Sequence, residues 1–81
     1  MEPNTDKIDE AVLALLHLTS YYEGKPEDTL PRAWKSHDWE ALNRLHEKNL
    51  ISNPKSKAKS VLLTEDGERL SKELFEKLFC S

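Results

Sequence analysis

Apolar positions recur at helical spacing near both ends of the chain. In the first segment they lie three to four residues apart, at Ile8, Val12, Leu15 and Thr19, and Ala11, Leu16 and Leu18 beside them broaden the stripe. This spacing predicts an amphipathic helix from Asp6 to about Thr19, capped by Thr5 or Asp6. The last segment has its apolar stripe at Leu70, Leu74, Phe75, Leu78 and Phe79. It predicts a second amphipathic helix, with Thr64 as the N-cap.

The middle of the chain predicts a third helix. Ser36 or Asp38 is its expected cap, and it runs to about Lys48. Its inner stripe is predicted at Trp39, Leu42 and Leu45, and its outward residues are Glu40, Asn43, Arg44 and Glu47. Asn49 is expected to end this helix, because asparagine tolerates the left-handed conformation that often follows a helix.

Short runs of β-type residues surround this middle helix. Residues 32–35 predict a strand with Trp34 turned inward, and a single helical turn is the alternative. Residues 50–51 and 60–63 predict a hairpin broken by Asn53 and Pro54. Residues 20–31 contain Gly24, Pro26 and Pro31 and predict an irregular connection.

The expected fold class is therefore α+β, as one domain over residues 1–81. The predicted order is helix, strand, helix, strand, strand, helix, with three strands in a small antiparallel sheet. Leu, Ile, Val and Phe make up 19 of 81 residues, so the core is expected to be small.

Charge is unevenly distributed along the chain. The formal net charge is −3, which argues against an indiscriminate polyanion binder. Residues 32–63, however, hold seven basic and three acidic side chains, a net charge of +4. The acidic excess lies in residues 1–31, at −5, and residues 64–81, at −2. A basic segment is thus flanked by acidic ones.

The sequence lacks the usual signals of secreted, membrane-spanning, metal-binding and enzymatic proteins. The single cysteine, Cys80, permits no internal disulfide, and no membrane span or signal peptide is visible, so a cytoplasmic protein is expected. The three histidines and Cys80 lack the spacing of a metal site. No phosphate-binding loop or nucleophile motif is present. We therefore expect no enzyme activity, no metal or other cofactor and no small-molecule substrate.

Two sequence motifs resemble a known pattern. The run ALNRLHEKNLI at residues 41–51, followed by LLTEDG at 62–67, resembles the winged-helix pattern of small bacterial regulators. The segments DKIDEAVLALL, RAWK, DWEALNRLHEKNLI and AKSVLLTEDG are similar to a family of uncharacterised small bacterial proteins, a domain-of-unknown-function family. The resemblance implies a winged-helix-like fold and no particular activity.

Two functions follow as hypotheses. The first is a nucleic-acid-binding transcriptional regulator, whose DNA-contacting residues would be Lys55, Lys57, Lys59, Arg44, Asn43 and Arg32. On an extended wing the three alternating lysines would share one face. The second is a protein-interaction module that keeps the winged-helix frame without binding DNA. It is favoured by the missing second helix before Asp38, because a helix-turn-helix needs two helices in tandem.

Four aromatic residues and the apolar stripe near the end of the chain could each form a core or a binding surface. Trp34, Trp39, Tyr21 and Tyr22 resemble a base-stacking platform, but a small core is better served by burying the tryptophans, which we predict. The stripe Leu74, Phe75, Leu78 and Phe79 is predicted to pair with a second copy as a homodimer, and covering the chain's own core is the alternative.

Overall fold

Three helices and a two-stranded antiparallel sheet form the fold, in a computed structural model that describes residues 2–22 and 30–80. The elements are α1 (Thr5–Leu18), β1 (Arg32–Trp34), α2 (Trp39–Glu47), β2 (Ser60–Leu62) and α3 (Glu65–Phe79). The predicted α+β class is confirmed. Most of the irregular connection predicted over residues 20–31 lies outside the described residues.

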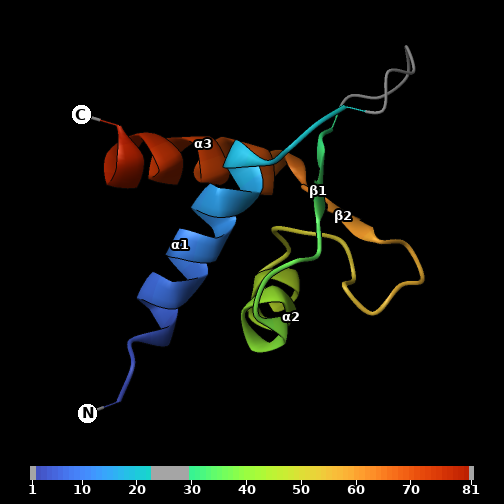
Figure 1. Cartoon of the computed structure of the whole chain (residues 1–81), viewed down its shortest axis with the longest axis horizontal. Coiled ribbons are helices and arrows are strands. Elements are labelled where there is room, and N and C mark those ends of the chain that lie inside the picture. The colour runs from blue at the N-terminus through green and yellow to red at the C-terminus, as the bar shows by residue number, and fades with distance from the viewer. Residues whose placement is uncertain (1, 23–29, 81) are drawn as a thin grey trace.

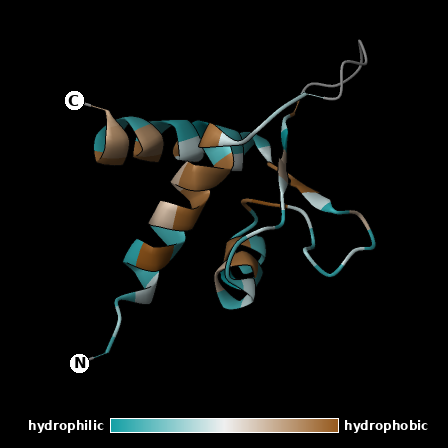
Figure 2. Cartoon of the chain, in the orientation of Figure 1, coloured by the Kyte–Doolittle hydropathy of each residue, from teal (hydrophilic) through white to brown (hydrophobic). Residues whose placement is uncertain are grey.

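The helix α1 connects the other parts of the molecule. It packs against α3 and also contacts α2 and β1 (Figure 1). Hydrophobic residues recur along its length, whereas the segment between α2 and β2 is mostly polar (Figure 2). The buried apolar residues form one cluster to which all five elements contribute. The three helices and the sheet therefore share a single core.

The inner face of α1 differs from the predicted one. Asn4, rather than Thr5 or Asp6, caps the helix, and its side chain accepts a hydrogen bond from the Lys7 N–H at 3.2 Å. Leu13 and Leu16 are buried, while Ile8 is exposed. The predicted stripe is thus confirmed at Val12 and at the adjacent Leu16 but not at Ile8 or Thr19, because apolar residues surround much of this helix and helical spacing alone fits more than one face.

The sheet is shorter than predicted, and Trp34 is on its outer face. The register pairs Ala33 with Val61 and Trp34 with Ser60. Ala33 and Val61 are fully buried, so the alternate residue Trp34 points away from the core and is 51% exposed. The inward orientation predicted for Trp34 is therefore wrong.

The third predicted strand, at residues 50–51, is reduced to a bridge between Ile51 and Leu63. Two further hydrogen bonds link the same segments: Ser52 N–H donates to the Leu62 carbonyl at 2.8 Å, and Leu62 N–H donates to Ser52 Oγ at 2.9 Å. The Ser52 hydroxyl thus accepts a hydrogen bond that a backbone carbonyl would accept in a regular pair of strands. The chain then turns at Pro54, so a regular strand cannot form.

The ends of α2 agree with the sequence prediction. Asp38 is the N-cap and accepts a hydrogen bond from Ala41 N–H at 3.1 Å. Asn49 follows the helix with a φ of 61°, the left-handed conformation predicted for it. Leu42 and Leu45 are buried, but Trp39 is 53% exposed at the first turn. The prediction that Trp39 packs inward is wrong.

The start of α3 is joined to the end of α2. Thr64 caps α3 by accepting from Gly67 N–H at 3.0 Å, as predicted, and its hydroxyl also lies 2.9 Å from the Asn49 carbonyl. A Cβ at residue 67 would collide with the Leu50 carbonyl, so this close approach requires glycine. The LTEDG motif therefore packs the start of α3 closely against the end of α2.

Candidate functional site

The lysine loop, residues 53–59, projects three basic side chains. Its root is fixed: Pro54 is buried, and the Asn53 Oδ1 accepts from Lys55 N–H at 2.9 Å. Lys55, Lys57 and Lys59 are exposed, and none of them forms an ion pair within the described part of the chain. The loop consists of turns and bends, so the extended wing assumed for these lysines is wrong.

Lys35 connects the lysine loop to β1. Its N–H donates to the Lys59 carbonyl at 3.1 Å, just beyond the pair formed by Trp34 and Ser60. Its ammonium donates to the Ser56 carbonyl at 2.8 Å and lies 3.3 Å from Ser56 Oγ. The Lys35 charge therefore lies against the loop and adds to its positive potential.

Asn43 and Lys55, predicted together as nucleic-acid contacts, line one polar hollow of about 320 Å³ with His46, Glu47 and Asn53. The His46 Nδ1 lies 3.2 Å from the Ile51 carbonyl. A carbonyl only accepts, so Nδ1 donates, and Nε2 is left as an acceptor in the neutral ring. The hollow offers amides and an imidazole, but the Glu47 carboxylate offsets the Lys55 charge there.

Arg44 does not face outward as predicted. Its Nε donates to both carboxylate oxygens of Asp9, at 3.0 and 2.8 Å. The Lys48 Nζ lies 3.4 Å from the same carboxylate and 3.8 Å from Asp6. Arg44 and Lys48 are one helical turn apart, on the side of α2 that meets α1. The guanidinium is thus committed to an internal ion pair.

Electrostatics keep the Asp9 carboxylate charged despite its burial. Burial raises the pKa of Asp9, but the hydrogen bonds and positive charges of Arg44 and Lys48 outweigh it and hold that pKa below its usual value. The hydrogen bond to Asp9 raises the pKa of Arg44. Sequence analysis missed this cluster. The one sequence signal for it is the position of Asp9, three residues before Val12, which places an acid on the face of α1 that Val12 buries.

Arg32 lies on the outer face of the sheet, apart from Asn43. Its Nε donates to Ser60 Oγ at 2.8 Å, and one terminal NH₂ donates to the Ser60 carbonyl at 3.2 Å. The guanidinium is therefore held across the two strands. Of the residues predicted to contact nucleic acid, the structure brings Arg32 and Lys59 to the sheet and Asn43 and Lys55 to the hollow.

The terminal stripe is divided between core and surface. Leu74 is only 8% exposed and belongs to the chain's own core, so it cannot form part of a dimer surface as predicted. Phe75 is half-buried, and its ring centroid lies 5.3 Å from that of His17 and 5.7 Å from that of Phe79. Leu78 and Phe79 remain exposed.

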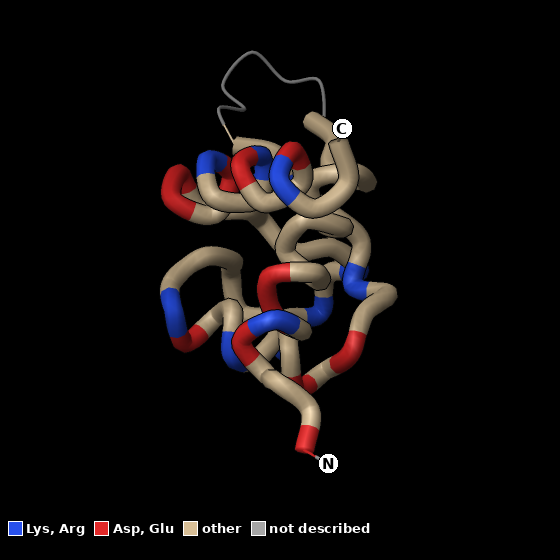
Figure 3. Tube along the Cα trace, turned by 90° about the vertical axis from the view of Figure 1, so that its left-hand side faces the viewer, with Lys and Arg blue, Asp and Glu red and all other residues tan. Residues whose placement is uncertain are grey.

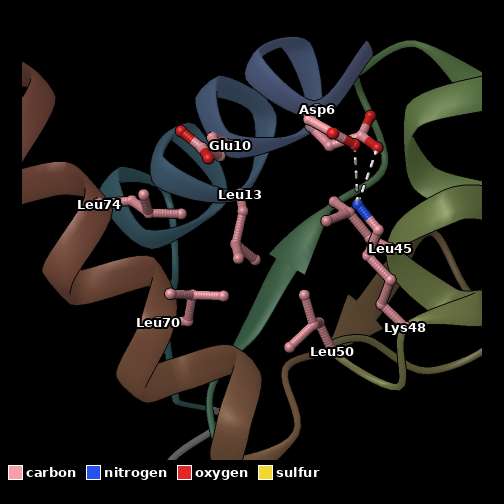
Figure 4. A pocket seen from close by; sticks show the side chains of 9 residues that line it. Asp6, Glu10, Leu13, Leu45, Lys48, Leu50, Leu70 and Leu74 are labelled. Atoms are coloured by element: carbon pink, nitrogen blue, oxygen red, sulfur yellow. Dashed lines mark hydrogen bonds and ion pairs between the residues drawn. The ribbon is translucent and has the colours of Figure 1, made fainter.

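A cleft of about 370 Å³ opens between the three helices (Figure 4). It is lined by five leucines, namely Leu13, Leu45, Leu50, Leu70 and Leu74, and by the charged residues Asp6, Asp9, Glu10 and Lys48. A second hollow of about 430 Å³ shares Glu10 and extends to Leu78 and Phe79. The sequence predicted neither, because each combines residues from distant elements.

The described residues contain neither a metal-binding cluster nor a membrane-spanning helix. Among the residues at 2–22 and 30–80, no group of three or more His, Cys, Asp or Glu side chains is placed to hold a metal ion. No helix in the same ranges combines the length and apolar character that crossing a bilayer requires.

Comparison with known proteins gives a family and no activity. The model of a family described as "Domain of unknown function (DUF6429)" matches residues 4–81. The "Uncharacterized protein y4hR" of Sinorhizobium fredii (strain NBRC 101917 / NGR234) is 51% identical over 79 residues, covering 98% of this chain and 97% of that protein. No solved structure matches significantly. The chain therefore belongs to the DUF6429 family of uncharacterised proteins.

Proposed function

We propose that the protein binds nucleic acid through the lysine loop, without a catalytic step. The observation that carries the proposal is the exposure of Lys55, Lys57 and Lys59 on one short loop, with no ion pair to any described residue. Each ammonium is available to a phosphate, and release of condensed counterions would then favour binding.

The arrangement of the elements supports a reduced winged helix. α2 followed by the lysine loop and β2 has the order of a recognition helix and its wing. Arg44 is engaged with Asp9, and Glu40 and Glu47 are exposed on α2, so this helix offers little for base edges. We infer that phosphate contact dominates and that sequence preference is weak.

The test measures binding to a fluorescent random duplex by anisotropy at several salt concentrations. Replacing Lys55, Lys57 and Lys59 with alanine should lower the slope of log affinity against log salt by up to about 2.7, at about 0.9 per phosphate contact. The matched control replaces Lys7, Lys72 and Lys77, on α1 and α3, which removes the same charge elsewhere. Equal losses for both variants, or no binding by the parent protein, would refute the proposal.

A protein-interaction role is the second candidate, as a homodimer. It is favoured by Leu78 and Phe79, exposed by 45% and 52% beside the second hollow. Acidic and basic side chains are interspersed along α3 (Figure 3), so a facing copy could pair some of them with opposite charges. Sedimentation of the parent and of Phe79→Glu tests this role, with Leu18→Glu as control because Leu18 is 59% exposed on α1. A parent that stays monomeric at high concentration would exclude it.

A further inference from the structure

We infer that the outer face of the sheet stacks an unpaired base, so that the preferred ligand is single-stranded nucleic acid. The inference rests on the proposed function and names its ligand class. It starts from Trp34, whose indole is 51% exposed although core packing was expected to bury it. A tryptophan half in water leaves much apolar surface uncovered, which suits a ligand with an aromatic face.

Tyr21 extends this surface into a two-ring platform. Tyr21 and Arg32 exchange two backbone hydrogen bonds of 2.8 Å each, which adds Tyr21 to the ladder beside β1. Its ring centroid lies 5.7 Å from that of Trp34, with the two planes inclined by 31°. The Tyr21 ring therefore packs against one side of the Trp34 indole and restricts its orientation. Base stacking on such rings tolerates any sequence, because every base has a π-face.

Positive charge next to the platform supplies the partner for a sugar-phosphate backbone. The Trp34–Ser60 pair is followed directly by the hydrogen bond from Lys35 to Lys59, so the lysine loop begins where the platform ends. The Arg32 guanidinium lies on the platform's own face, where it is hydrogen-bonded to Ser60. Aromatic rings beside a basic loop are the combination by which single strands are held.

A duplex fits this surface less well. Its bases are already stacked on each other, so their faces are closed to Trp34 unless the helix is opened. The platform should therefore add affinity for single strands only, while the lysines act on both forms. This difference separates the inference from the proposed function.

The experiment compares binding to short oligo(dT) and to a duplex of the same length. Trp34→Leu keeps an apolar cover over Ser60 but has no aromatic face, and it should weaken oligo(dT) binding about 5- to 140-fold. Trp34→Phe should keep most of the affinity. Trp39→Leu is the matched control, since Trp39 is 53% exposed on α2. All variants are checked for folding by circular dichroism.

A second readout does not depend on a stability change. In Trp39→Phe protein, Trp34 is the one remaining tryptophan, and oligo(dT) should quench its fluorescence whereas the duplex should not. The inference is overturned if Trp34→Leu and Trp39→Leu weaken binding alike, or if the emission does not change. If Trp34 has no effect but loss of the three loop lysines lowers both affinities, the proposed function stands alone. Absence of any binding removes both.

Discussion

Five of the seven cations of residues 32–63 form two groups with opposite surroundings. Arg44 and Lys48 turn toward α1 and converge on Asp9, a carboxylate only 1% exposed. Lys55, Lys57 and Lys59 point into solvent from a loop that offers them no carboxylate in the described part of the structure. The net charge of a segment therefore does not measure the charge that it can offer a ligand, because part of that charge is paired inside the fold.

The largest expected effect tests the orientation of α2, on which the division depends. Arg44 meets α1 because Leu42 and Leu45 face the core. Leu42→Ala should lower the free energy of unfolding by about 2 to 5 kcal/mol, since it leaves a cavity in a small core. Trp39→Ala, on the exposed side, should cost far less. Urea denaturation measures both, and equal costs would mean that α2 is oriented differently.

The next effect concerns the buried ion cluster itself. Asp9→Ala leaves Arg44 and Lys48 without their shared carboxylate, and we expect a loss of about 2 kcal/mol, typical of lost hydrogen bonds between charged groups, because the two cations are 28% and 48% exposed and can be hydrated. The control is Asp66→Ala, which breaks the exposed Asp66–Arg69 pair at 3.1 Å and should cost at most about 1 kcal/mol. Thermal and urea unfolding of the parent protein and the two variants measures these losses. Similar stabilities for Asp9→Ala and Asp66→Ala would contradict the expected difference between a buried and an exposed ion pair.

Acid should weaken the same cluster in the parent protein. The pKa of Asp9 is lower in the folded chain than in the unfolded one, so its stabilisation is present above the ordinary carboxyl pKa of about 3.9 and is lost as pH falls through the folded value. The free energy of unfolding of Asp9→Asn should therefore fall less steeply below pH ~4. Parallel pH profiles for the two proteins would show that Asp9 does not titrate in this way.

The smallest effect compares single cations from the two groups. Lys57→Ala should reduce the salt slope of duplex binding by about 0.9 and change the free energy of unfolding by less than about 0.5 kcal/mol. Arg44→Gln should do the reverse: it should destabilise the fold and leave the salt slope unchanged. Anisotropy titrations at a temperature where both variants are folded would show it. A reduced salt slope for Arg44→Gln would mean that Arg44 contacts the nucleic acid.

Local signals in the sequence predicted much of the frame. Capping preferences, which involve only neighbouring residues, predict the roles that Asn49 and Thr64 have, and they leave Ser36 and Asp38 as alternatives for the cap that Asp38 provides. β1 was also found, but a three-residue strand cannot show which of its faces is covered. The orientation of Trp34 is decided by the burial of Val61 across the sheet.

The candidate site was less predictable, because its parts meet over long distances in the chain. Asp9 and Arg44 are separated by 35 residues, and nothing near either one indicates the other. Without this pair, Arg44 was assigned to the outer face of α2. The lysines of the loop were recognised, since their exposure depends on local composition, but their extended arrangement was lost to the turn at Pro54.

The closed base of the lysine loop has a consequence for how the chain tolerates change in length. The hydrogen bond from Ser52 N–H to the Leu62 carbonyl joins the segments on either side, and the one from Lys35 N–H to the Lys59 carbonyl holds the end of the loop beside β1. The residues between Pro54 and Lys59 are exposed and do not belong to the core. Inserting residues there would mainly lengthen a closed loop, and each doubling of a loop's length costs only about 0.6 kcal/mol of chain entropy. The reach of this segment could therefore be varied almost independently of the fold that carries it.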